Sequence, residues 1–144
     1  MIHKSVNNLI AIKKEIQSKK DNIQIIAVSK TFPIKQIYPL INHGHKHYGE
    51  NKVQEALEKW VDIKNDFPDI KLHLIGKLQT NKVKFAVQIF DYIHSVDSEK
   101  LAKKIVDEQN KINKKIKIFL QVNIGDENQK SGINKNNVKQ LVYY

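Results

Sequence analysis

Helical and strand patterns alternate along the whole sequence, and this alternation limits the fold more than any other feature of the chain. Apolar residues at helical spacing predict helices, and the short apolar runs between them predict strands. The expected strands, each followed by a helical pattern, are residues 23–29, 46–49, 71–75, 92–96 and 117–124. Strands joined through helices run parallel, because each helix returns the chain to the starting edge of the sheet. The sequence therefore predicts an α/β fold with a parallel sheet.

Two parallel architectures compete, an open doubly wound sheet and a TIM-barrel-like (β/α) fold. In residues 117–124 one face is apolar, and the other becomes polar toward the end of the strand, with Phe119, Gln121 and Asn123. Polar residues at the carboxyl ends of strands suit a barrel mouth that holds a ligand, so we favour the barrel. A full barrel needs about 250 residues, whereas this chain has 144. We expect one domain, residues 1–144, with about five of the eight βα units, that stops within its sixth helix.

Composition excludes several functional classes. The chain has no cysteine, which excludes disulfides and thiolate catalysis and suits a reducing compartment. No apolar run is long enough to cross a bilayer, and no signal peptide is evident, so we expect a cytoplasmic protein. The net charge is +10, but all 25 basic residues are lysine. Without arginine, specific nucleic-acid recognition is not expected, and weak salt-sensitive binding is the alternative.

One lysine stands at a special place. Residues 25–28 are apolar and lead through Ser29 directly into Lys30. Desolvation lowers the pKa of a lysine, so an amine at the mouth of an apolar strand can act as a neutral nucleophile. Such amines form Schiff bases with aldehydes, including that of pyridoxal phosphate. The plainer interpretation is that Lys30 ends the strand and extends to water.

Polar residues that end the other strands should surround Lys30. Each has an ordinary explanation on its own, as a helix cap or a core histidine, and their joint position is the signal. The candidates are Asn51, His73, Ser95 and Asn123.

Other motifs give weaker indications of function. His43, His45 and His47 alternate and could share a strand face as metal ligands, but no carboxylate partner is evident, and we predict no metal site. Gly76-Lys77 is not a phosphate-binding loop, because neither the preceding glycine nor the following Ser/Thr is present.

Several segments, taken together and in order, resemble the signatures of the pyridoxal phosphate homeostasis protein family. They are Ala27-Val28-Ser29-Lys30-Thr31, residues 48–55, residues 73–82, residues 93–98, and residues 121–124 with 130–133. The resemblance implies a barrel of the alanine racemase N-terminal domain type. It also implies that Lys30 holds pyridoxal 5'-phosphate as a Schiff base, with Asn51, His73, Ser95 and Asn123 lining the cofactor cavity.

The resemblance implies a non-catalytic carrier or buffer of the cofactor, with apoenzymes that use pyridoxal phosphate as partners. One alternative is a fragment of a racemase-like enzyme, although the second acid/base group that racemases take from another domain has no counterpart here. Another is an inactive truncated remnant, because the family's later phosphate-holding segments also lack a counterpart. The open sheet edges of such a chain predict self-association or complementation by a C-terminal fragment.

Overall fold

The computed structural model describes residues 1–19, 22–125, 127–128 and 130–143. Its main feature is a parallel sheet in which the strands lie in sequence order, β1-β2-β3-β4-β5. The strands are β1 (Ala27–Val28), β2 (His47–Glu50), β3 (Lys71–Leu74), β4 (Tyr92–Val96) and β5 (Lys117–Leu120). The predicted α/β class and parallel order are confirmed.

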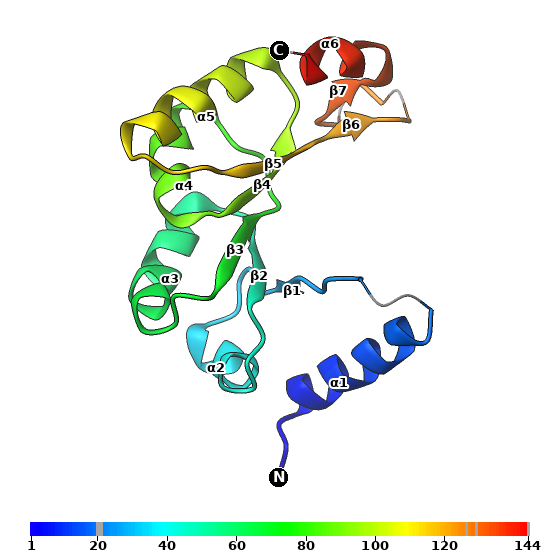
Figure 1. Cartoon of the computed structure of the whole chain (residues 1–144), viewed down its shortest axis with the longest axis vertical. Helices are drawn as coiled ribbons and strands as arrows, with labels where there is room; N and C mark the ends of the chain where they lie inside the picture. The colour runs from blue at the N-terminus through cyan, green and yellow to red at the C-terminus, as the bar shows by residue number, and fades with distance from the viewer. Residues whose placement is uncertain (20–21, 126, 129, 144) are drawn as a thin grey trace.

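Helix α1 (Lys4–Gln17) precedes the first strand, and the helices that follow connect the strands and cover one side of the sheet. They are α2 (Ile34–Asn42), α3 (Val53–Asp66), α4 (Val83–Ile89, after the 3-10 turn η1, Thr80–Lys82) and α5 (Glu99–Lys111). Helices α2 to α5 follow the convex side of a curved sheet, and the opposite, concave side is open (Figure 1). This arrangement is an arc of a barrel and not a doubly wound sheet, in which helices cover both faces.

The chain ends in a smaller unit beside the main sheet. It contains the two-stranded parallel sheet β6 (Val122–Asn123) and β7 (Ile133–Asn134), the 3-10 turn η2 (Lys135–Asn137) and α6 (Val138–Val142). The predicted fifth strand, residues 117–124, is thus divided between β5 and β6. Tyr144, the last residue of the sixth predicted helix, lies outside the described residues.

The core lies between the convex face of the sheet and the helices. Tyr48, Leu72 and Ile93 project from the neighbouring strands β2, β3 and β4 and are fully buried against Trp60 and Phe90. Burying a large apolar side chain contributes about 1.5–3 kcal/mol, so this layer is the main source of stability in the structure.

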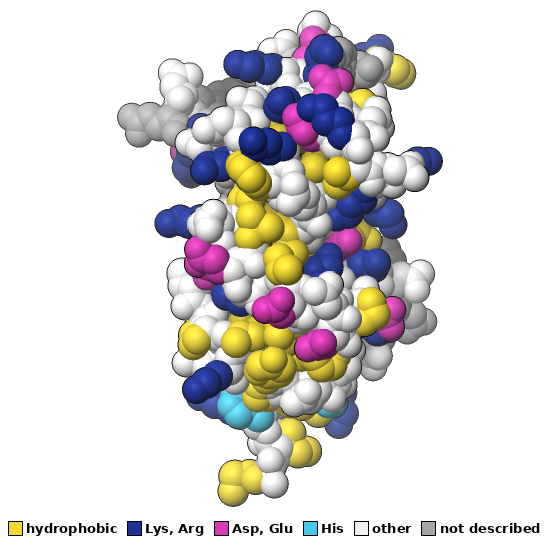
Figure 2. Space-filling view, turned by 90° about the vertical axis from the view of Figure 1, so that its left-hand side faces the viewer, with side chains coloured by type: hydrophobic (Ala, Val, Ile, Leu, Met, Phe, Trp, Pro, Cys, Tyr) yellow, Lys and Arg dark blue, Asp and Glu magenta, His cyan; other side chains and the backbone are white. Residues whose placement is uncertain are grey.

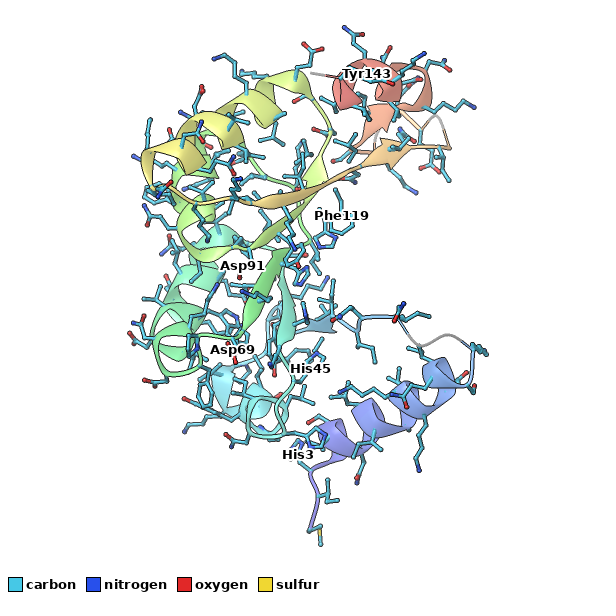
Figure 3. All side chains as sticks on the ribbon, viewed as in Figure 1. His3, His45, Asp69, Asp91, Phe119 and Tyr143 are labelled. Carbon is cyan, nitrogen blue, oxygen red and sulfur yellow. The ribbon has the colours of Figure 1, made fainter. Side chains whose placement is uncertain are left out.

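The first strand is shorter and more exposed than expected. Residues 23–29 were predicted to be a buried strand, but pairing covers only Ala27–Val28, and Ile23 and Val28 are about half exposed. The reason is position: β1 is an edge strand, and among the described residues its concave side has no facing wall. Phe119 on the opposite edge strand is half exposed for the same reason, and its ring lies on the concave side (Figure 3).

The outer face carries charges of both signs. Lysines and acidic side chains are interspersed there with apolar groups, and the visible face shows no extended patch of one sign (Figure 2). This distribution agrees with the expectation that the chain is not a specific nucleic-acid-binding protein. None of the described helices has the length and apolar character needed to cross a membrane.

The carboxyl ends of β2 and β3 approach each other closely at Gly76. A Cβ atom built on Gly76 would overlap the main-chain oxygen of Asn51. Because that oxygen belongs to the backbone, it cannot move aside as a side chain would. Gly76 therefore fixes how near the chain after β3 lies to Asn51.

We expect Gly76→Ala to destabilise the fold by roughly 1–3 kcal/mol, the usual cost of overpacking a close contact. Urea unfolding checks this value. Gly125→Ala is the matched control, because a Cβ there meets only ordinary contacts with Glu127. Equal stability of the two variants would contradict the close approach.

Candidate functional site

Lys30 follows the end of β1, where the backbone is still tied to β2. The Ser29 amide donates to the carbonyl of Gly49 at 2.9 Å, and the Ser29 hydroxyl donates to Glu50 Oε1 at 2.8 Å. Lys30 comes next and is half-buried. No hydrogen bond or ion pair joins its amine to another of the residues described.

A buried charge network lies beside Lys30. Glu50 is fully buried, and its Oε1 accepts hydrogen bonds from Ser29, from Lys59 Nζ at 2.9 Å and from Trp60 Nε1 at 2.8 Å. Lys59 Nζ also donates to the carbonyl oxygen of Ser29 at 2.9 Å and to Glu55 Oε1 at 3.0 Å. The network joins β1, β2 and α3 immediately before Lys30.

Asn51 lies at the same end of the sheet as Lys30. The register pairs Val28 with Gly49, and Lys30 and Asn51 each follow their partner by two residues. The structure therefore places these two candidates at one edge, as parallel pairing requires.

His73 lies deeper, within β3, at the level of Gly49 on one side and Tyr92 on the other. Its Nε2 is 2.9 Å from Nδ1 of His47, and its Nδ1 is 2.9 Å from Nε2 of His94. Tyr92 stacks on the His73 ring with centroids 4.2 Å apart. Three neighbouring strands thus carry a chain of three hydrogen-bonded histidines.

This histidine chain lines an open cavity of about 680 Å³ on the concave side of the sheet. Phe119 stacks on His94 at 4.4 Å between ring centroids and covers that end of the chain. The other residues of the cavity wall are Gln24, Ile26, Lys46, Asp69 and Lys71. Aromatic and imidazole rings form one part of this wall, and charged side chains of both signs form another.

Burial lowers the pKa of all three histidines. The pKa of His73 falls to about 4, because its ring is buried and the neighbouring imidazoles His94 and His47 disfavour a further positive charge. A neutral imidazole donates from one nitrogen and accepts at the other. At neutral pH His73 therefore donates a hydrogen bond to one neighbouring histidine and accepts one from the other.

Neither Ser95 nor Asn123 has a described hydrogen bond to Lys30. Ser95 is buried in the register irregularity between β4 and β5, and its hydroxyl has no hydrogen-bond partner among the described residues. Asn123 lies in β6, where its amide nitrogen donates to the carbonyl of Glu127 at 2.7 Å. The structure therefore brings Lys30 and Asn51 together, places His73 in the histidine chain, and engages Asn123 with its own loop.

Sequence reasoning missed Lys59 and the pairing of His47 with His94 through His73. Glu55 and Lys59 have the i, i+4 spacing that brings opposite charges together on a helix, and this spacing was the available signal. The alternating His43, His45 and His47 do not converge. Within the described ranges, no group of three or more His, Cys, Asp or Glu residues is arranged to hold a metal ion.

Comparison with known proteins supports the same fold. The family model described as "Alanine racemase, N-terminal domain" matches residues 5–144. A pyridoxal phosphate homeostasis protein of Pasteurella multocida is 33% identical over 93% of this chain and 60% of its own length. One of Aquifex aeolicus is 40% identical over 84% of this chain and 52% of its own.

A solved structure gives the same result. The structure of PipY of Synechococcus elongatus PCC7942 with bound PLP, that is, pyridoxal phosphate, superimposes with a TM-score of 0.76 at 36% identity. It covers 90% of this chain, and this chain covers 61% of it. The sequence thus spans about half to three fifths of the length of these relatives.

The fold and the matching family model identify the chain as a member of the alanine racemase N-terminal domain family. Within that family, the chain belongs to the pyridoxal phosphate homeostasis proteins. The resemblance noted from the motifs is therefore confirmed.

We expect stability to fall as the pH is lowered from about 6.5 to about 4, in part because of His73. The pKa of His73 is about 4 in the fold and about 6.5 in an unfolded chain, so between these values the unfolded state binds more protons. The full loss from this one residue is about 3 kcal/mol. Urea unfolding at several pH values measures it.

His73→Asn should flatten this part of the pH dependence, whereas His43→Asn, at an exposed position, should leave it unchanged. The same pH slope in wild type and His73→Asn would contradict the buried neutral histidine chain.

Proposed function

We propose that this chain binds pyridoxal 5'-phosphate through a Schiff base to Lys30 and acts as a non-catalytic carrier or buffer of the cofactor. The observation that carries the proposal is the Lys30 amine, which stands unpaired among the described residues while the backbone on both sides of it is held. The family to which the chain belongs, and the relative with bound PLP, support the choice of cofactor.

The residues present fit an aldehyde ligand. A lysine that reacts with an aldehyde must have an amine that is not consumed by a carboxylate. Lys59 is bound to Glu50 and Glu55 and is unsuited to this role, whereas Lys30 has no such partner in the described structure. When bound, the cofactor supplies an aldehyde carbon, to which the Lys30 nitrogen adds with loss of water.

Around Lys30, we propose that Asn51 lines the cofactor cavity at the edge of the sheet. His73, which lies further inside the sheet within β3, lines the same cavity with a neutral ring. Ser95 supplies a buried hydroxyl that has no other described partner. Asn123 belongs to the same proposal, although it must release its bond to Glu127 to take part.

A carrier needs reversible binding but no positioned proton transfer. Racemase or transaminase chemistry requires a second acid/base group aimed at the substrate carbon. The Lys30 amine has no ionisable partner among the described residues, which favours the carrier over the racemase-like alternative. We further propose cytoplasmic pyridoxal phosphate-dependent apoenzymes as recipients, and a single domain that forms the first units of a (β/α) barrel.

Titration of the protein with pyridoxal phosphate should produce the visible absorption band of a Schiff base, and Lys30→Ala should abolish it. Lys77→Ala is the control, because Lys77 is exposed and follows β3 at the same end of the sheet. A band of equal strength in Lys30→Ala would show that surface lysines react and that the assignment is wrong.

The carrier proposal also predicts no amino-acid racemase, decarboxylase or transaminase turnover above that of free cofactor. Exchange of the α-proton of added alanine into deuterated water, followed by NMR, measures the most sensitive of these reactions. Stereospecific exchange that disappears in Lys30→Ala would favour the enzyme alternative instead.

A further inference from the structure

We propose that Glu55 is a positioning residue for Lys30, acting through the backbone of Thr31. The inference rests on the proposed role of Lys30 and adds to it a residue that sets where the amine can reach. Glu55 touches neither Lys30 nor a ligand, so its effect passes through the main chain.

The contact itself is short and charged. The Thr31 amide donates to Glu55 Oε1 at 2.6 Å, and the same oxygen accepts from Lys59 Nζ at 3.0 Å. Hydrogen bonds to an ionised carboxylate are about twice as strong as neutral ones. Glu55 lies in the first turn of α3, a helix packed against the sheet, so its carboxylate is carried by a rigid element.

Thr31 needs such a contact because of its backbone conformation. Its φ angle is +65°, in the left-handed region that a β-branched residue rarely adopts. The carboxylate of Glu55 accepts the hydrogen bond from the backbone amide of Thr31 in this conformation. Without the contact, the strained φ angle of Thr31 would be less stabilised, and the backbone after Lys30 would shift toward an ordinary conformation.

A second contact closes the other side of the turn. The Phe32 amide donates to the carbonyl of Ser29 at 3.2 Å, and Lys59 holds that same carbonyl at 2.9 Å. Residues 29–32 therefore form a turn in which Lys30 is the first central residue. Side chains of α3 bind the Ser29 carbonyl before Lys30 and the Thr31 amide after it. Lys59 joins the two contacts by binding Ser29 and Glu55 together.

An analogous clamp elsewhere in the molecule has no lysine to position. Lys64, also on α3, binds Asp91 at 2.6 Å and the Ile89 carbonyl at 3.0 Å, and Asp91 accepts from the Leu72 amide. This pair fixes the amino ends of β3 and β4. The clamp at Ser29 and Thr31 differs because it encloses a single residue with an unpaired amine.

The test compares Glu55→Ala, Glu55→Gln and Glu58→Ala in the full 144-residue chain. Glu55→Gln keeps an oxygen that can accept from Thr31, and Glu58 lies on the same helix but, among the described residues, binds only Gln54. Three readouts are taken: amide exchange at Thr31 by NMR, competitive labelling of Lys30 by acetic anhydride, and the rate of Schiff-base formation with pyridoxal phosphate.

Glu55→Ala should accelerate Thr31 amide exchange about tenfold, as expected for loss of one charge-assisted hydrogen bond. It should also change Lys30 labelling relative to the other lysines and slow Schiff-base formation by roughly tenfold, since small misplacement of a reacting group is costly. Glu55→Gln should recover most of each effect, and Glu58→Ala should show none.

Thr31→Gly supplies an independent arm, because glycine adopts the left-handed conformation without strain. Combined with Glu55→Ala, it should restore Lys30 reactivity, and it keeps the test informative if Glu55→Ala alone fails to fold. Unchanged Thr31 exchange and Lys30 labelling in Glu55→Ala, or equal effects of Glu55→Ala and Glu58→Ala, would overturn the inference. Absence of Schiff-base formation in wild type would refute the proposed function alone, because exchange and acetic anhydride labelling still report on positioning.

Discussion

The buried carboxylate of Glu50 is the interaction on which the rest of the structure depends. It stands at the end of β2, inside the molecule, and receives the Ser29 hydroxyl, the Lys59 ammonium and the Trp60 indole. A buried charge is tolerated only when it is paired and hydrogen-bonded, and removing one partner typically costs about 3–5 kcal/mol. Glu50 therefore ties β1 to β2 and both strands to α3, and this attachment holds the backbone from which Lys30 extends.

The two faces of the sheet have different roles, one in stability and the other in presenting polar and aromatic side chains. The convex face is filled by large apolar side chains such as Leu72 and Ile93 against the helices, and it supplies stability. The concave face carries the histidine chain through His73 with the aromatic rings that stack on it. Side chains alternate between faces along each strand, so the short strands provide a core on one side and a chemically distinct surface on the other.

The sequence was sufficient for the order of elements and for the edge that holds Lys30 and Asn51, because strand patterns and parallel pairing determine both. It was not sufficient for the depth of His73, which depends on the register between β2 and β3 and cannot be seen within either strand. Lys59 was missed because its contacts with Glu50 and Ser29 depend on how α3 packs against β1 and β2, and its spacing from Glu55 was the available local signal. The exposure of Val28 was missed because an apolar run does not reveal that its strand is an edge.

Trapping the cofactor on the protein tests the central claim most directly. The chain is treated with pyridoxal phosphate, reduced with borohydride and digested, and the modified lysine is identified by peptide mass spectrometry. The account predicts that one of the 25 lysines, Lys30, carries nearly all of the label at limiting cofactor. Label spread over many surface lysines, or concentrated on a lysine other than Lys30, would contradict it.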